Sequence, residues 1–217
     1  MKQTKRRAAA KVGTLDKGAR KHAANGPTKG EKTQARLVEA AIEEFYERGF
    51  HEARVSGIVA RAKVTQPAFY LYFSSKEKIH SHLVQRVRTD LINIIKGAQV
   101  PPALLAPAAR GGIRSAIEVF LQYFADNPKL ATIGYFDADA SASIRAETTL
   151  LVARNIAAEQ AAGYLRKDLD TAFVAECYCG SVDRLITRYL LNQKEKVSTL
   201  GHKIADIYFG GILQGRD

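Results

Sequence analysis

The stretch that decides the fold is Gly49–Lys76, GFHEARVSGIVARAKVTQPAFYLYFSSK. In its first half, apolar residues recur at i, i+3, i+4 and i+7, which is the spacing of one buried face of a short helix. These residues are Val55, Ile58, Val59 and Ala62. The pattern breaks at Lys63 and Val64. The sequence therefore predicts a short helix that ends in a tight turn.

A second short helix follows this turn. Thr65 is a good N-cap, and Pro67 is tolerated because it falls in the first turn of the helix. Phe69 and Phe73 are four residues apart, so both point to the core. The face turned away from them carries Gln66, Pro67 and Tyr70. Two short helices, the second exposing hydrogen-bonding and flat apolar groups, are suited to a DNA major groove, which makes this stretch a helix-turn-helix.

The register of these residues resembles the TetR family of bacterial transcriptional regulators. The matching positions are Gly49, Phe50, Val55, Ile58, Ala62, Val64, Thr65, Phe69, Tyr70, Tyr72, Phe73, Ser75, Lys76 and Glu77. The resemblance covers roughly residues 31–80, and beyond them it rests on a helical pattern of the right length. Two positions depart from the family: Lys63 stands at the turn where Gly is usual, and Ser56 where a longer polar or basic residue is common. A positive φ at Lys63 would store roughly 1–2 kcal/mol of strain.

The rest of the chain shows helical patterns and no strand-like alternation of useful length, which predicts an all-α fold. A first helix begins at about Thr28, where Thr28–Glu31 fits a capping box, or at Thr33, and it ends near Arg48. A second capping box at Ser74–Glu77 begins a long helix, and residues 98–112 form a loop rich in Pro and Gly. Three regions are expected: a basic flexible tail at 1–30, a three-helix helix-turn-helix DNA-binding domain at 31–78, and a helical ligand-binding and dimerisation domain at 79–217, joined by the long helix.

Charge and composition narrow the class of protein. The chain of 217 residues has a net charge of +11, and residues 1–30 hold nine basic residues against the single acid Asp16. This tail either tracks DNA phosphates or is only a solubilising extension. No apolar run approaches the roughly 20 residues that span a bilayer, and the N-terminus lacks the apolar core of a signal peptide, so we expect a cytoplasmic protein without membrane contact.

Catalysis is not expected. The five histidines are scattered, and no Ser–His–Asp pattern, phosphate-binding Gly loop or Cys cluster appears. Cys177 and Cys179 are two positions apart on an expected helix, so their side chains diverge, and they are interpreted as buried reduced thiols. The sequence therefore indicates no enzyme, no metal site and no cofactor.

Candidate DNA contacts gather on the second helix of the motif. Gln66 is the best base reader, because a carboxamide can pair with adenine N6 and N7. Small apolar surfaces that fit a thymine methyl group are offered by Pro67 and Ala68. Phosphate contacts are expected from Arg54, Thr65, Tyr70, Tyr72 and Lys76, of which Arg54 is also a base candidate and Tyr72 could instead pack inward.

Two further sites concern regulation. A ligand pocket with Arg145 serving an anionic group is predicted from Phe120, Tyr123, Phe124, Tyr135, Phe136, Arg145 and Tyr178, although aromatic residues at helical spacing could be plain core. As the resemblance implies, the last two helices form the dimer surface, unless their apolar faces only complete the monomer core. The dimer residues expected are Gly180, Ser181, Val182, Leu185, Tyr189, Ile204, Ile207, Tyr208 and Gly211.

The sequence is thus interpreted as a homodimeric repressor that binds a palindromic site on double-stranded DNA and leaves it when a small apolar or amphipathic effector binds. One alternative is an architectural or division-linked DNA-binding protein with no inducer. Another is a helical enzyme with an incidental helix-turn-helix pattern. A cavity among residues 113–190 favours the inducible regulator, and a solid core there favours the architectural protein.

Overall fold

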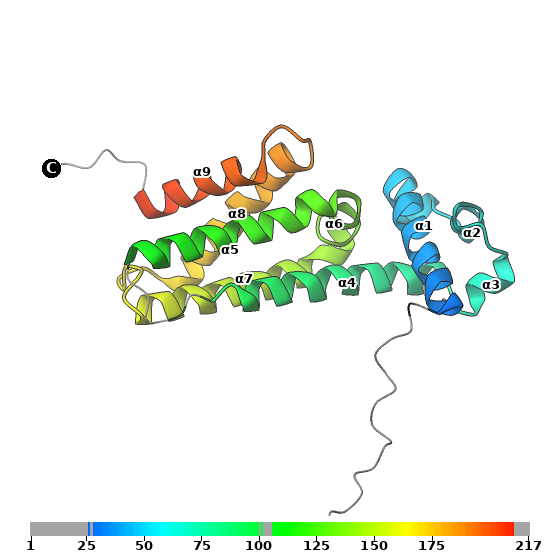
Figure 1. The fold of residues 1–217 in the computed structure, drawn as a ribbon, viewed down its shortest axis with the longest axis horizontal. Helices are drawn as coiled ribbons and strands as arrows, with labels where there is room; N and C mark the ends of the chain where they lie inside the picture. Colours follow the sequence, from blue (N-terminus) through cyan, green and yellow to red (C-terminus); the bar gives the residue numbers. More distant parts are fainter. Residues whose placement is uncertain (1–25, 27, 100, 102–105, 211–217) are drawn as a thin grey trace, which may run out of the picture.

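The computed structural model describes residues 26, 28–99, 101 and 106–210, and these residues form helices and connecting turns, with no strand among them (Figure 1). The helical segments are α1 (Lys29–Glu52), α2 (Val55–Ala62), α3 (Gln66–Tyr70), α4 (Lys76–Gly97), α5 (Ala106–Asp126), α6 (Pro128–Gly134), α7 (Ala138–Ala161), α8 (Thr171–Leu185), the π-helical segment η1 (Ile186–Leu190) and α9 (Val197–Gly210). The expectation of an all-α fold is confirmed. In this part of the chain no helix is long and apolar enough to cross a membrane.

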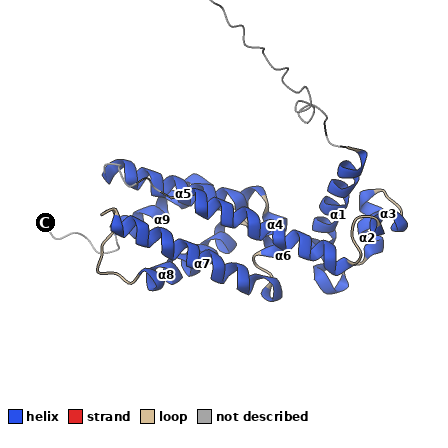
Figure 2. Cartoon of the chain, turned by 90° about the horizontal axis from the view of Figure 1, so that it is seen from below, coloured by secondary structure: helices blue, strands red, loops and turns tan. Residues whose placement is uncertain are grey.

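The molecule is elongated, with a small head at one end (Figures 1 and 2). Helices α1, α2 and α3 form the head, and α4 runs from the head into a body that also contains α5 to α9. Within the body, α5 packs against α9 and α7 packs against α8. The short helix α6 contacts both α1 and α4, so it lies where head and body meet.

The start and end of α1 follow from local chemistry. The hydroxyl of Thr28 accepts a hydrogen bond from the Glu31 N–H at 3.2 Å, and the Glu31 carboxylate accepts one from the Thr28 N–H at 2.7 Å, which is a complete capping box. The regular helix breaks at Gly49, whose φ of 72° is left-handed, but one more turn continues to Glu52. The regular helix therefore ends near Arg48, as the sequence predicts, and the turn that reaches Glu52 follows a kink at Gly49.

Lys63 closes the turn between α2 and α3 with φ 54° and ψ 46°, which is the left-handed backbone that Gly adopts without strain. Its N–H donates to the carbonyl oxygen of Ala60 at 3.2 Å. The departure from the family pattern at Lys63 thus keeps the geometry of the turn.

Helix α4 joins head and body through one continuous apolar stripe. The buried stripe consists of Ile79, Leu83, Val87, Leu91 and Ile95. Gly134 of α6 packs so closely on Val87 that an added Cβ would lie 2.6 Å from a methyl group of the valine. Close packing of this kind fixes α6 against the middle of α4.

Two boundaries differ from the sequence-based expectation. The N-cap of α4 is Ser75, whose hydroxyl accepts the Lys78 N–H at 3.3 Å, rather than Ser74. Helix α5 begins at Ala106, inside the stretch 98–112 that was expected to be a loop. Proline is tolerated near a helix start and packing of the buried Ala109 outweighs the weak helix propensity of glycine, so Pro and Gly are misleading signals here.

Candidate DNA-binding face and effector cavity

The helix-turn-helix is held to α1 by one buried carboxylate. Glu44 of α1 is only 2% exposed. Its carboxylate accepts from the Arg61 Nε at 3.1 Å and the Arg54 backbone N–H at 3.4 Å, and it pairs with the Arg48 Nε at 3.2 Å. Gly57 of α2 lies against this group, with room for no side chain. The arrangement fixes α2, and through the Lys63 turn also α3, relative to α1.

Helix α3 presents its polar edge to the outside. Phe69 is fully buried beneath it, and Phe73 is nearly so. The side chains of Arg54, Thr65, Gln66, Pro67 and Tyr70 are exposed, and Ala68 is half-buried. Thr65 caps the helix, because its hydroxyl accepts the Ala68 N–H at 3.4 Å. Five of the eight predicted DNA-contacting residues therefore lie in or directly before α3 with surface available to a duplex, and a sixth, Arg54, is exposed at the start of α2.

The remaining two predicted DNA contacts are used inside the head. The Lys76 ammonium donates to the carbonyl oxygens of Phe50 and His51 at 2.7 and 3.1 Å, and it lies 4.7 Å from the centre of the Phe50 ring. Tyr72 is half-buried and packs on the core. The geometry thus favours a structural role for Lys76, which ties the end of α1 to α4, over the phosphate contact expected from the sequence.

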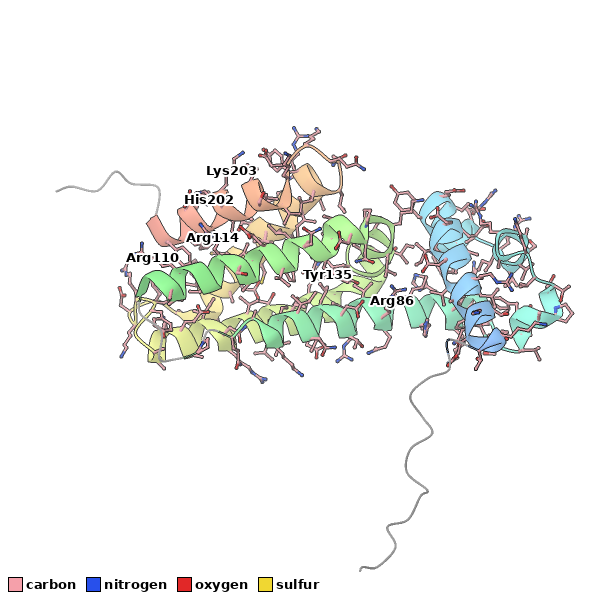
Figure 3. The ribbon with its side chains drawn as sticks, viewed as in Figure 1. Arg86, Arg110, Arg114, Tyr135, His202 and Lys203 are labelled. Carbon is pink, nitrogen blue, oxygen red and sulfur yellow. The ribbon has the colours of Figure 1, made fainter. Side chains whose placement is uncertain are left out.

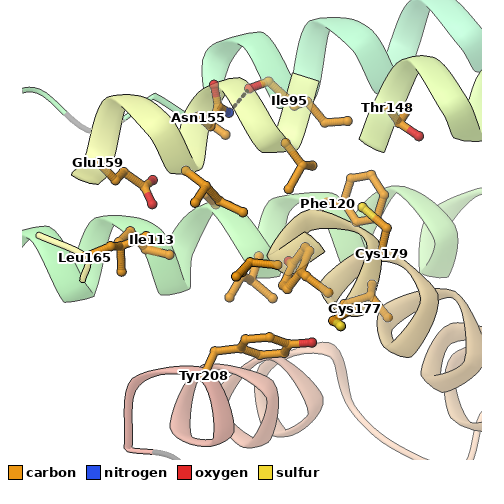
Figure 4. Close-up of a pocket in the computed structure, with 18 of the residues that line it drawn as sticks. Ile95, Ile113, Phe120, Thr148, Asn155, Glu159, Leu165, Cys177, Cys179 and Tyr208 are labelled. Carbon is orange, nitrogen blue, oxygen red and sulfur yellow. Dashed lines mark hydrogen bonds between the residues drawn. The ribbon is translucent and has the colours of Figure 1, made fainter. Parts of the chain in front are cut away.

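A cavity of about 530 Å³ lies in the body, between α4, α5, α7, α8 and α9 (Figure 4). This is within the range of small-molecule sites. Apolar side chains make up most of its wall, among them Ile95, Ile113, Phe120 and Val182. Arg110 lies at its edge, on the end of α5 far from the head (Figure 3).

A few polar groups interrupt the apolar wall. The Asn155 amide donates to the Ile95 carbonyl oxygen at 2.9 Å, tying α7 to the last turns of α4. Burial raises the pKa of Glu159 to about 7 and that of Cys179 to about 11, so this thiol stays protonated near neutral pH. Cys177 also lines the cavity but is exposed, which corrects the expectation that both thiols are buried.

Three of the seven predicted ligand residues line this cavity: Phe120, Tyr135 and Tyr178. The other four are not among its lining residues: Tyr123, Phe124, Phe136 and Arg145. Phe124 is fully buried against the rings of Tyr135 and Phe136. Arg145 donates to the Tyr135 carbonyl oxygen at 3.1 Å and lies over that ring, so it is engaged within the chain instead of facing a ligand. For the three aromatic residues of this group, the plain-core alternative describes the geometry.

The sequence interpretation missed the polar groups that α7 contributes to the cavity wall, which are Thr148, Asn155, Glu159 and Gln160. The signal available was weak, because α7 has almost no segregation of polar and apolar residues and its buried side cannot be recognised from periodicity. A polar residue on such a helix looks the same in the sequence whether it faces solvent or a cavity.

The predicted dimer residues divide into two groups. Val182 and Ile204 are buried within the chain, and Leu185 packs on its core, so for these three the alternative of a completed monomer core describes the geometry. The outer surface of the last helices carries Gly180, Tyr189, Ile207 and Tyr208, with Ser181 half-buried. Gly211 lies outside the described residues.

Tyr208 also belongs to the cavity wall. Its hydroxyl lies 2.8 Å from that of Ser181, and its ring contacts the Tyr178 ring at 5.2 Å. The outer surface of α8 and α9 and the cavity therefore share a side chain.

Comparisons with known proteins agree with this arrangement. The model for "Bacterial regulatory proteins, tetR family" matches residues 37–83. The Bacillus subtilis HTH-type transcriptional regulator YdgC, whose own function is uncharacterised, is 31% identical over 191 residues, which cover 88% of this chain and 98% of the relative. The Bacillus subtilis fatty acid metabolism regulator protein is 23% identical over 185 residues, covering 81% and 93%.

Solved structures show the same fold. The fatty acid degradation regulator FadR from Bacillus halodurans has a TM-score of 0.67 at 20% identity, covering 86% of this chain and 98% of that one. FadR from Bacillus subtilis in complex with stearoyl-CoA has a TM-score of 0.65 at 19% identity, covering 83% and 100%. The SmeT–triclosan complex has a TM-score of 0.64 at 18% identity, covering 85% and 96%. With its exposed α3 and full-length relative, the chain belongs to the TetR family and is a DNA-binding transcriptional regulator.

Proposed function

We propose that this regulator is a cytoplasmic homodimeric repressor that binds a palindromic operator and is released by a mainly apolar small molecule. The observation that carries the proposal is the cavity of about 530 Å³ in the body, far from the α3 surface. An architectural DNA-binding protein has no need of such a cavity. Two structural neighbours are described with stearoyl-CoA, which carries a long apolar acyl chain on a polar, anionic CoA group, and with triclosan, which is largely apolar.

Operator reading is assigned to α3. Gln66 is exposed at the start of the helix, where its carboxamide can reach a base edge, and Pro67 and Ala68 follow it with small apolar surfaces. Thr65, Tyr70 and Arg54 flank them and are suited to phosphates. A single head spans only a few base pairs, so specificity needs two heads on successive major grooves, about 34 Å apart.

The dimer that supplies the second head is assigned to the outer surface of α8 and α9. Ile207 is 51% exposed and Phe173 is 70% exposed, which is unusual for side chains of this size. A two-fold axis through these helices would bury the exposed apolar groups of both copies.

Release is assigned to movement of α4. The cavity touches α4 through Ile94, Ile95 and Ala98, near its C-terminal end, while its N-terminal end packs in the head. The lysine of α6, Lys129, forms an ion pair with Glu43 of α1, which gives the body a second hold on the head. A ligand that prefers one position of α4 shifts the population of head spacings, and its differential affinity sets how far.

Selection of bound sequences from random DNA tests the operator assignment, followed by a gel-shift titration of the selected site with and without effector. The expected consensus is two inverted half-sites, protected by one dimer. A consensus without inverted symmetry, or a purified full chain that ignores DNA at low ionic strength, would contradict the proposal.

A further inference from the structure

Among the described residues, one acidic side chain in the cavity wall has no cation or hydrogen-bond donor beside its carboxylate. Glu159 projects from α7 toward the cavity, in a wall where its neighbours on the lining include Ile113, Ile156 and Leu165 (Figure 4). Within the described residues its carboxylate accepts no hydrogen bond and forms no ion pair. Its backbone carbonyl oxygen accepts from the Tyr164 N–H at 2.9 Å and the Leu165 N–H at 3.4 Å.

The other charged groups of the cavity are already satisfied or solvated. Asp183 accepts from the Tyr135 hydroxyl at 3.0 Å and lies 3.6 Å from the Arg145 guanidinium. Arg166 forms a two-pronged pair with Asp168. Arg110 is exposed at the edge of the cavity. Burial alone accounts for the raised pKa of Glu159, with no cation near enough to oppose it.

A partly buried carboxylate without a partner is unfavourable, so its presence in an apolar wall calls for a group that the chain itself does not provide. A protonated amine supplies this group, because an ammonium ion donates charge-assisted hydrogen bonds to a carboxylate. We propose that the cavity takes a mainly apolar molecule carrying one amine, whose ammonium group pairs with Glu159. This inference rests on the proposed effector function and specifies the chemistry of its ligand.

The pairing depends on pH. Glu159 ionises around pH 7, so affinity for an ammonium group rises as the pH increases from about 6 to about 8. The other titratable or charged groups of the cavity wall are Arg110 from α5, Tyr135 at the end of α6, Tyr164 and Arg166 from the segment after α7, Cys177, Tyr178, Cys179 and Asp183 from α8, and Tyr208 from α9. None of those with a resolved pKa shift is moved toward this pH window except Asp183, which is held by Tyr135 and Arg145.

Three probes with the same alkyl chain test the chemistry: decylamine, decanol and decanoate. Isothermal titration calorimetry on the full chain should show the amine binding about tenfold tighter than the acid. Glu159→Gln should abolish this preference while leaving decanol affinity unchanged. Glu176→Gln removes the same charge from an exposed position of α8 that is not part of the cavity wall, and it should leave the preference intact.

The binding and DNA-release results together distinguish failure of the amine assignment from failure of the effector function. Decanoate binding as tightly as decylamine, or a Glu159→Gln protein that still prefers the amine, would overturn the amine assignment. If decanoate also releases DNA in a gel shift, the effector function survives and only the ligand chemistry falls. If no probe binds the cavity and none releases DNA, the amine assignment falls and the effector function loses its support with it.

Discussion

The contact between Gly57 and Glu44 is the sharpest point at which the head can be tested. A Cβ added at Gly57 would lie 2.3 Å from one carboxylate oxygen of Glu44 and 2.6 Å from the other. The carboxylate cannot simply rotate away, because it is buried and held by the Arg61 side chain and the Arg54 backbone N–H. Gly57→Ala must therefore break contacts that join α1 to α2.

The loss follows from the bonds that break. Hydrogen bonds to a charged group contribute about 1.5–3 kcal/mol each, and the Arg61 and Arg54 bonds together contribute about 3 kcal/mol at the lower value. The pair with Arg48 adds little, because that side chain is 59% exposed. Alanine recovers up to about 1 kcal/mol of helix propensity. The expected net loss at Gly57→Ala is about 2 kcal/mol, or a fall in Tm of roughly 4–8 °C for a chain of this size.

The assay is urea unfolding followed by circular dichroism, with Gly111→Ala as the matched control. Gly111 lies inside α5 with nothing within 4 Å of an added Cβ, so its substitution should stabilise the protein by up to about 1 kcal/mol. In a Glu44→Ala background the obstruction is gone, and Gly57→Ala should become neutral or stabilising. Equal destabilisation of both backgrounds would refute the reasoning, as would a change of only a few tenths of a kcal/mol.

Four further expectations follow from other parts of the molecule. Gln66→Ala should relax the selected consensus at one base pair per half-site and weaken binding by about 1–3 kcal/mol, and an unchanged consensus would remove Gln66 as a base reader. Lys63→Gly should raise the free energy of unfolding by about 1 kcal/mol, because it relieves the strain of a φ of 54°, and Gln193→Gly, at φ 53°, should do the same. A lower free energy of unfolding for both variants would show that neither backbone is strained. The raised pKa of Glu159 means that the folded protein binds this proton more tightly than the unfolded chain does, so the group opposes folding increasingly as the pH rises from about 4.5 to about 7. Glu159→Gln should therefore raise Tm at pH 8 but not at pH 4, and an equal change in Tm at both pH values would contradict this. Ile207→Glu should yield monomers in sedimentation velocity, because a charge would replace an exposed apolar contact of the assigned dimer surface, and an unchanged dimer would move the interface elsewhere.

The head could be predicted from the sequence because its signals are local. The apolar spacing around Ile58, the N-cap at Thr65 and the capping box at Thr28 each act within one or two helical turns, and each is found where expected. The buried carboxylate of Glu44 could not be predicted in this way. Its partners lie 10 and 17 residues further along the chain, and only the folded arrangement brings them together.

The cavity of the proposed effector, in contrast, could not be predicted from local sequence signals. Aromatic residues at helical spacing were a poor guide, because Phe124 and Phe120 lie one turn apart on α5 and only Phe120 reaches the cavity. Which of two neighbouring rings faces empty space depends on how five helices are placed around it. Local periodicity gives the buried side of a helix but not the gaps left when buried sides meet.

The head and the body differ in the contacts that hold α4. This difference bears on how a ligand in the cavity could move the head. In the head, the Glu44 cluster and the Lys76 bonds to Phe50 and His51 fix α1, α2 and the start of α4 to one another. Beyond the head, α4 is tied to α7 by the ion pair of Arg88 with Glu147 at 2.7 Å. In its last turns the tie is the Asn155 amide, whose acceptor carbonyl belongs to the cavity-lining Ile95. A helix of 22 residues is about 33 Å long, so a small tilt imposed at the cavity displaces the whole head as one unit. In the proposed release mechanism a head that moves as one unit need not change its α3 surface, because a changed distance between the two heads of the proposed dimer is sufficient to lose the operator.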